Sequence, residues 1–417
     1  MGDRDPSAGD DRLSDTAPAR WRVLALLAAA EVLGMSLWFS ASAVSGQYRA
    51  LWALSAAEAG WLTTIVQLGF VAGTAAAALL NLADVLPSRW FFAGSALLGA
   101  LANLALAEAS SYSQALGFRF LTGFCLAGVY PPAMKMAASW FRANRGLAIG
   151  TIVGALTVGK ALPYLVRSAD VNAIRPVVLV ASAAAATSAL LIAAGYRDGP
   201  YEFPRRPFSW QLVATVARHQ ETRLATLVYL GHMWELYAMW TWVPGYLAAS
   251  AAVRAAGGHP VPVERVYLLA FGTIAIGGLG ALWGAWAARR IGYAAVTVRA
   301  MVASGLCCLA AGLFFGTSFL LLAPFVLLWG FFVVADSAQF SAMVSETAPP
   351  HAVGTALTLQ TSLGFLLTMI TIQLVPALAD ALGWRLAFAF LAPGPAAGIA
   401  AIRRLDVLVS SRAERET

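Results

Sequence analysis

Charged residues are scarce in this chain. Only 12% of its 417 residues are Asp, Glu, Lys or Arg, whereas 59% are hydrophobic, and the mean hydropathy is +0.70. A soluble domain of this size needs more polar side chains to cover its surface. Apolar runs of about twenty residues, each long enough to cross roughly 30 Å of hydrocarbon, recur along most of the chain. The composition excludes a soluble protein and predicts a polytopic membrane protein.

Cysteine and histidine are also rare. The three cysteines, Cys125, Cys307 and Cys308, lie in apolar runs, so we expect no disulfide framework. The four histidines provide no pair with metalloprotease spacing, and no Ser nucleophile elbow or Gly-rich phosphate loop occurs. The chain is therefore not expected to be an enzyme, and we expect no cofactor and no resident metal.

Lysine is nearly absent, which draws attention to the two that occur, Lys135 and Lys160. Both lie inside apolar runs, whereas loops take their positive charge from arginine. Lysine is a compact point charge that can lose its proton when buried, which arginine effectively cannot do. We predict that Lys160 contacts substrate, the alternative being a structural ion pair. Lys135 is assigned to an inner gate, the alternative being that it snorkels toward the membrane surface.

Twelve apolar segments are expected to be transmembrane helices. They cover residues 21–45, 59–82, 90–109, 113–137, 146–167, 174–195, 223–250, 264–288, 294–315, 319–345, 353–377 and 383–402. The longest polar interruption, at 196–222, separates six segments from six. The prediction is an all-α protein with a disordered tail at 1–20, six-helix bundles at 21–195 and 223–402, a linker at 196–222 and a tail at 403–417.

The arginines predict the orientation of the chain. With the N-terminus inside, arginines concentrate in the inner loops, the linker and the C-terminal tail, and few lie outside. This asymmetry places both termini in the cytoplasm of a bacterial-type inner membrane. It also accounts for the net charge of +7 without nucleic-acid binding. The expected partners are lipid, protons and a small-molecule substrate, and we expect a monomer.

Two similar patterns lie inside the first and seventh segments. In each, a carboxylate is followed by Met four positions on and Trp seven positions on, which would place all three on one face of a helix. The residues are Glu31, Met35 and Trp38, and Glu235, Met239 and Trp242. We assign all six to substrate binding, as two walls of one cavity. Trp234 and Trp240 lie off this face and are expected to pack or to face lipid.

The two glutamates lie deep in the membrane. Glu31 is ten residues into its segment and Glu235 twelve, or about 15 and 18 Å at roughly 1.5 Å per residue. Ionisable residues at this depth are costly and usually mark a substrate or proton pathway. Burial favours the neutral form of a carboxyl group, so each could exchange a proton near neutral pH. We assign both to proton coupling; the alternative is a permanently protonated, hydrogen-bonded glutamate.

Two further residues lie near this face or depth. His232, one turn before Glu235, is assigned to substrate binding together with Tyr130 in the fourth segment. Asp336 is a third deep acid, expected to pair with one of the lysines or to act as a second proton site.

Several motifs resemble those of the major facilitator superfamily. The loop after the second segment keeps Asp84 and Arg89 at the spacing of the family signature, although Leu80 and Pro87 replace its glycines. The fourth segment carries an arginine-plus-glycine motif, Arg119 to Gly123, and Tyr130-Pro-Pro-Ala-Met begins a stretch similar to nitrate and nitrite porters. The two substrate arginines of those porters are missing, which disfavours nitrate.

The resemblance implies twelve helices in two bundles with substrate bound between them. It assigns Arg119 to proton coupling, with helix bracing as the alternative, and Asp84, Arg89 and Arg145 to an inner gate.

We therefore predict a proton-coupled secondary transporter for a small organic anion or zwitterion, with a planar part held by tryptophan. Two alternatives stay open at this point. Met and His beside the glutamates would suit a transition-metal, copper-type carrier. Acids in a tryptophan-rich cavity would suit an exporter of lipophilic cationic drugs.

Overall fold

The computed structural model describes residues 18–142, 144–169, 174–201 and 209–416, and within these ranges the chain forms helices and no strand. The first part contains α2 (Ala19–Met35), α3 (Ser40–Ala43), α4 (Ser45–Trp52), α5 (Ala56–Leu79), α6 (Leu82–Val85), α7 (Ser88–Ala105), η1 (Leu106–Glu108), α8 (Tyr112–Leu126), α9 (Tyr130–Ala138), α10 (Arg145–Ala169) and α11 (Ile174–Gly195).

The second part begins with a short helix, α12 (Trp210–Arg218), in the linker. It continues with α13 (Gln220–Ala256), α14 (Val263–Ala275), α15 (Gly277–Ile291), α16 (Tyr293–Phe314), α17 (Phe319–Ala335), α18 (Ser337–Thr347), α19 (Val353–Leu382), α20 (Trp384–Ala387), η2 (Phe388–Leu391) and α21 (Pro393–Glu416).

All twelve expected segments are helical, but several consist of more than one helix. The first is broken between α2 and α3, the fourth between α8 and α9, and the tenth between α17 and α18. Sequence periodicity did not predict these breaks, and two of them lie at the site described below. The first seventeen residues of the expected N-terminal tail lie outside the described residues, whereas the C-terminal tail continues α21 as far as Glu416.

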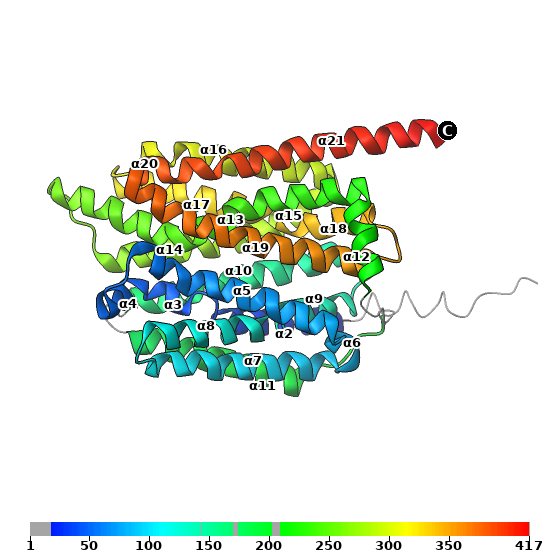
Figure 1. The fold of residues 1–417 in the computed structure, drawn as a ribbon, viewed down its shortest axis with the longest axis horizontal. Helices are drawn as coiled ribbons and strands as arrows, with labels where there is room; N and C mark the ends of the chain where they lie inside the picture. Colours follow the sequence, from blue (N-terminus) through cyan, green and yellow to red (C-terminus); the bar gives the residue numbers. More distant parts are fainter. Residues whose placement is uncertain (1–17, 143, 170–173, 202–208, 417) are drawn as a thin grey trace, which may run out of the picture.

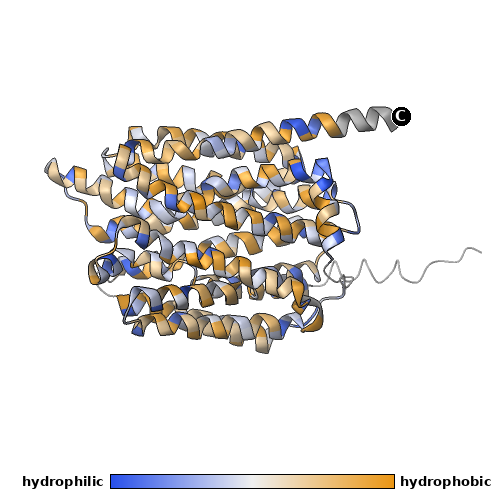
Figure 2. Ribbon diagram, viewed as in Figure 1, coloured by the Kyte–Doolittle hydropathy of each residue, from blue (hydrophilic) through white to orange (hydrophobic). Residues whose placement is uncertain are grey.

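The two parts of the chain lie side by side (Figure 1). Helices α2 to α9 and α11 form the lower group in this view, and α13 to α21 form the upper group. They meet where α10 packs along α14 and α15, and where α5 packs along α19. Figure 2 shows hydrophobic residues along the length of the helices in both groups. Residues of α9, α10, α13, α17, α18 and α19 line the cavity between the two groups that is described below.

Nine of the helical segments that the structure describes are long and apolar enough to cross a membrane. The three expected spans outside this set are α2 with α3, α8 with α9, and α13. They are shortened by breaks or made more polar by their side chains, and they carry Glu31, Arg119, His232 and Glu235. The spans that look least like membrane helices thus hold four of the deep ionisable groups, whereas Lys160 and Asp336 lie in spans of the apolar set.

Glycines allow several helices to approach one another closely. A Cβ atom on Gly159 of α10 would clash with the carbonyl oxygen of Val32 on α2, and one on Gly284 of α15 would clash with that of Ala335 on α17. Backbone atoms cannot move aside as a flexible side chain can. These glycines therefore fix the distance between helices.

We predict that Gly159→Val destabilises the protein, because α10 must move away from α2. Overpacking typically costs about 1–3 kcal/mol, and a backbone neighbour places this variant toward the upper end. The melting temperature in detergent should fall, and the protein should be less monodisperse by size-exclusion chromatography. The matched control is Gly117→Val on α8, where an added Cβ meets no atom within 4 Å. Equal melting temperatures for the two variants would contradict the prediction.

Candidate substrate and coupling site

A buried arginine holds the break in the first span. Arg119 of α8 is fully buried and donates hydrogen bonds to the carbonyl oxygens of Leu37 (2.9 Å), Trp38 and Leu62 (3.2 Å). It also donates to the Ser40 hydroxyl at 3.1 Å. The acceptors named here are neutral, so the guanidinium is stabilised by carbonyl dipoles. The residue ties the α2–α3 break to α5, which is the bracing arrangement; its role in proton coupling stays a prediction.

A buried lysine lies where the two halves meet. The Lys160 ammonium of α10 is 3.8 Å from the ring centroid of Trp38, 4.4 Å from that of Tyr237 and 5.5 Å from that of Trp240. It donates a hydrogen bond to the Tyr237 hydroxyl. Cation–π contacts are strongest at desolvated sites such as this one, because the side chain is fully buried. The cation is thus enclosed by one ring from the first half and two from α13.

The acidic residue that interacts with Lys160 is Glu31. Its side chain is fully buried on α2, and among the described residues neither carboxyl oxygen has a hydrogen-bond partner. It interacts electrostatically with Lys160 and with Tyr130 of α9. A buried carboxyl without donors is costly, so it is expected to be protonated or to take a partner from a ligand or water. Glu31 therefore has the properties expected of an exchangeable proton site.

The first of the two predicted faces is not one helical face. Helix α2 ends at Met35, and Trp38 lies in the turn before α3. The break directs the Trp38 ring onto Phe70 and Phe365, with centroids 5.3 and 5.5 Å apart, whereas Met35 is buried in the core. Spacing alone grouped these residues, and the break separates them.

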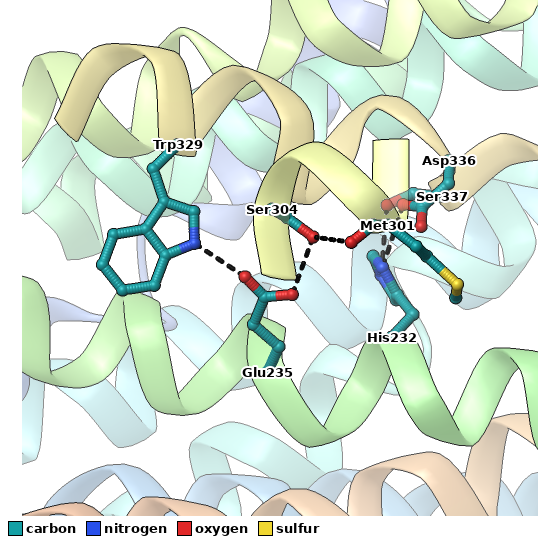
Figure 3. Close-up of polar contacts among 7 residues, drawn as sticks. All are labelled: His232, Glu235, Met301, Ser304, Trp329, Asp336 and Ser337. Carbon is teal, nitrogen blue, oxygen red and sulfur yellow. Dashed lines mark hydrogen bonds and ion pairs between the residues drawn. The ribbon is translucent and has the colours of Figure 1, made fainter. Parts of the chain in front are cut away.

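Glu235 does not face the cavity between the halves, contrary to our expectation. Its carboxylate accepts hydrogen bonds from Ser304 (2.9 Å) and Cys308 (3.2 Å) on α16 and from the Trp329 indole (2.6 Å) on α17. Figure 3 shows the carboxylate between Ser304 and Trp329. The group is thus satisfied inside the second helix group. The spacing of residues along a helix shows which of them share a face, but it does not show which neighbouring helix that face packs against.

Asp336 pairs with a histidine, not with a lysine as one interpretation of the sequence expected. Its carboxylate lies 2.9 Å from Nδ1 of His232, and Nε2 of the same ring lies 3.2 Å from the Ser337 hydroxyl (Figure 3). Asp336 is the residue between α17 and α18, so this break aims it at α13. Asp336 also interacts electrostatically with Glu235. The second half therefore holds a buried cluster of two acids and one imidazole, namely Glu235, Asp336 and His232.

A cavity with about 650 Å³ of empty space lies between the halves. Residues from both parts line it, including Tyr130, Thr157, His232, Tyr237, Trp240 and Gln360. Of the predicted substrate residues, Tyr130 and His232 line this cavity. Lys160 does not line it but donates a hydrogen bond to Tyr237, which does, and Met239 is buried in the core.

A second cavity, with about 1080 Å³ of empty space, lies farther along α13. Trp242 lines it together with Arg49, Asp380 and Trp384. The Trp242 indole donates a 2.7 Å hydrogen bond to the carbonyl of Ile372 on α19. Trp242 thus belongs to a different cavity from His232, with the rings around Lys160 between the two.

Tyr237 and Trp240 are the site residues that sequence reasoning missed. We expected Trp240 to pack or to face lipid, but both residues line the first cavity and surround Lys160. They lie three residues apart, so one helical face carries both. The sequence feature that could have identified them is this pair of aromatic residues, which lies on a different face of the helix from Glu235.

The predicted gate residues lie at helix ends. Arg89 follows the first residue of α7 and stacks over the Trp90 ring at 4.5 Å, and Arg145 is the first residue of α10. Lys135 is in the last turn of α9. Asp84 is in α6, and its side chain lies outside the described part of the structure. The gating roles of all four stay predictions.

We predict that Arg119→Gln destabilises the protein by about 3 kcal/mol, because several buried carbonyls lose their donor at once. The measurement is thermal unfolding in detergent. Arg175→Gln is the matched control, since Arg175 forms an exposed ion pair with Glu108 that is worth less than about 1 kcal/mol. If Arg119→Gln melts within a degree of the control, Arg119 does not brace the break.

Comparison with known proteins supports the fold. Two solved structures superpose over most of the chain: a variant of the nucleoside transporter NupG (TM-score 0.71, 14% identity, 92% of this chain and 99% of that one) and a bacterial homologue of the human lysosomal transporter Spinster in an inward-facing, unoccupied conformation (0.67, 15%, 94% and 96%). At these identities the likeness concerns the fold alone.

One curated relative is similar over a short stretch. A niacin transporter, NiaP of Acinetobacter baylyi, is 37% identical over 95 residues, which are 22% of this chain and 21% of that protein. The match therefore spans about a fifth of the relative's length.

The family model of the Major Facilitator Superfamily matches residues 24–370. Its members are membrane transporters of small molecules rather than enzymes, which agrees with the sequence-based expectation. The chain belongs to the major facilitator superfamily and is a multi-pass membrane transporter.

Proposed function

We propose that this transporter moves a small organic anion or zwitterion that carries a planar ring, and that it couples this movement to protons. The observation that carries the proposal is the buried Lys160 ammonium beside the cavity, enclosed by Trp38, Tyr237 and Trp240. A carboxylate would pair with the ammonium, and a flat ring would stack on the aromatic wall. Niacin, the cargo named for one relative, has both features and is the first probe to test.

Proton coupling is proposed to involve an acid in each half. Glu31 has no hydrogen-bond partner among the described residues and interacts electrostatically with Lys160, so protonation of Glu31 and binding of an anion at Lys160 affect one another. In the second half, Asp336 reaches the cavity through His232, while Glu235 lies deeper. Arg119 would hold the α2–α3 break in place and so fix the position of Trp38. The two halves would thus exchange protons from different positions.

The orientation and the gate complete the proposal. The proposed orientation has both termini in the cytoplasm of an inner membrane, and the placement of the arginines supports it. Asp84, Arg89, Lys135 and Arg145 would then lie at the cytoplasmic ends of their helices and act as the inner gate, with ion pairs that form in one conformation and break in another.

The competing cargoes receive different support. Met35 and Met239, which a copper-type carrier would use, do not line the cavity, and no three His, Cys, Asp or Glu side chains in the described residues lie close enough together to hold a metal ion. One observation favours a lipophilic cation: the Glu31 carboxyl, which has no hydrogen-bond partner among the described residues, could pair with the positive charge of such a ligand. Tetraphenylphosphonium is therefore the second probe.

We predict that Lys160→Met removes niacin binding, with the dissociation constant rising at least about 100-fold, because the variant keeps the bulk of the side chain and loses its charge. Isothermal calorimetry on purified protein is the measurement. Arg175→Gln also removes one positive charge, at an exposed position, and should bind like the wild type. Tight tetraphenylphosphonium binding with no niacin binding by the wild type would favour the exporter instead.

We also predict that Glu31→Gln and Glu235→Gln each abolish niacin-driven proton flux, because an amide cannot carry the proton. Proteoliposomes containing the dye pyranine measure this flux. Niacin counterflow, which needs no net proton movement, should persist in at least Glu31→Gln. The control is Glu108→Gln, at an exposed position. If both variants still acidify the liposomes at the wild-type rate, neither glutamate is a coupling site.

A further inference from the structure

Tyr237 contacts the buried Lys160 and also lines the cavity. Its side chain lines the cavity, whereas Lys160 is fully buried and is not part of the lining. Resting on the proposed function, we propose that Tyr237 determines specificity: its hydroxyl occupies the position on the Lys160 ammonium that a substrate carboxylate takes. Binding is then an exchange of one acceptor for another.

The chemistry at the ammonium favours such an exchange. A lysine ammonium has three N–H donors, and the Tyr237 hydroxyl is the one hydrogen-bond acceptor that the described residues offer it. The remaining stabilisation comes from aromatic faces and from the electrostatic interaction with Glu31. The acceptor in both cases faces the same ammonium, and a carboxylate, which carries a full negative charge, is attracted to it more strongly than a neutral hydroxyl is. A carboxylate can therefore displace the hydroxyl without leaving the buried cation unpaired.

The ring of Tyr237 defines what else the ligand must have. Its centroid lies 5.7 Å from that of Trp38, 5.3 Å from that of Trp240 and 5.2 Å from that of Phe365. These contacts keep the ring in the wall when the hydroxyl loses its partner. A flat ring attached to the carboxylate can cover the same wall from the cavity side. The fitting ligand class is a planar cyclic monocarboxylate, and small aliphatic acids should bind less well.

The exchange also concerns the contact between the two halves. Lys160 belongs to α10 and Tyr237 to α13, so their hydrogen bond joins one half of the protein to the other. A substrate that takes the ammonium removes this bond. Substrate binding would thereby loosen the contact between halves that must separate during alternating access.

The first test is Tyr237→Phe, which keeps the ring and removes the competing hydroxyl. Niacin and benzoate should bind about tenfold more tightly than to the wild type, since a hydrogen bond to a charged group no longer has to be displaced. Tyr246→Phe is the matched control: it lies on the same helix, and its hydroxyl donates to the Ala311 carbonyl inside one half. Unchanged or weaker binding by Tyr237→Phe would overturn the proposal.

The second test needs no ligand, so it separates this proposal from the proposed function. Hydrogen exchange measured by mass spectrometry should increase several-fold in peptides around Lys160 and Tyr237, for both Tyr237→Phe and Lys160→Met, and not for Tyr246→Phe. A wild type that binds neither acid would refute the cargo alone. If exchange in Tyr237→Phe matches the wild type, the hydroxyl does not join the halves and the inference fails, whatever the cargo.

Discussion

The site depends on the high free-energy cost of a cation without polar partners in the membrane interior. Arg119 is fully buried, and its guanidinium donates hydrogen bonds to backbone carbonyls that the α2–α3 break leaves without helical partners. The break and the arginine require one another, because unpaired carbonyls and an unpaired guanidinium are each costly in hydrocarbon. Their contact sets the position of Trp38, whose ring then covers Lys160. The geometry of the cation site thus begins at a residue that does not contact the cavity.

The two similar sequence patterns have diverged in their contacts. Glu31 has no hydrogen-bond partner among the described residues, whereas Glu235 accepts three hydrogen bonds. Three donors hold the Glu235 carboxyl in one position, so it would exchange a proton from a fixed site, whereas Glu31 can take a donor from a ligand or water. In the second half the acid nearest the cavity is Asp336, which reaches it through His232. Internal symmetry therefore predicted where acids lie in the membrane but not what each contacts.

Much of the fold follows from the sequence, because spans and their order depend on apolar length and on arginine placement. The depth of Glu31 and Lys160 follows from the same counting. The sequence could not show that α2 ends before Trp38, since no proline marks that break and Gly34 lies inside the last turn of α2 rather than beyond its end. Nor could it show that Trp240 faces the cavity, because the rotation of α13 depends on packing against helices distant in the sequence.

The contrast between the two buried cations explains their separate roles. Arginine presents five donors in a fixed planar fork, and Arg119 uses it to bind several backbone carbonyls that cannot leave. Lysine is a point charge on a flexible stem, and Lys160 has one side-chain hydroxyl and the faces of aromatic rings. The flexible lysine stem can move its ammonium from this hydroxyl to a ligand, whereas the carbonyls of packed helices hold the guanidinium in place. Binding energy from a ligand can therefore be used at Lys160 to break a contact between halves, while Arg119 keeps the first span intact throughout.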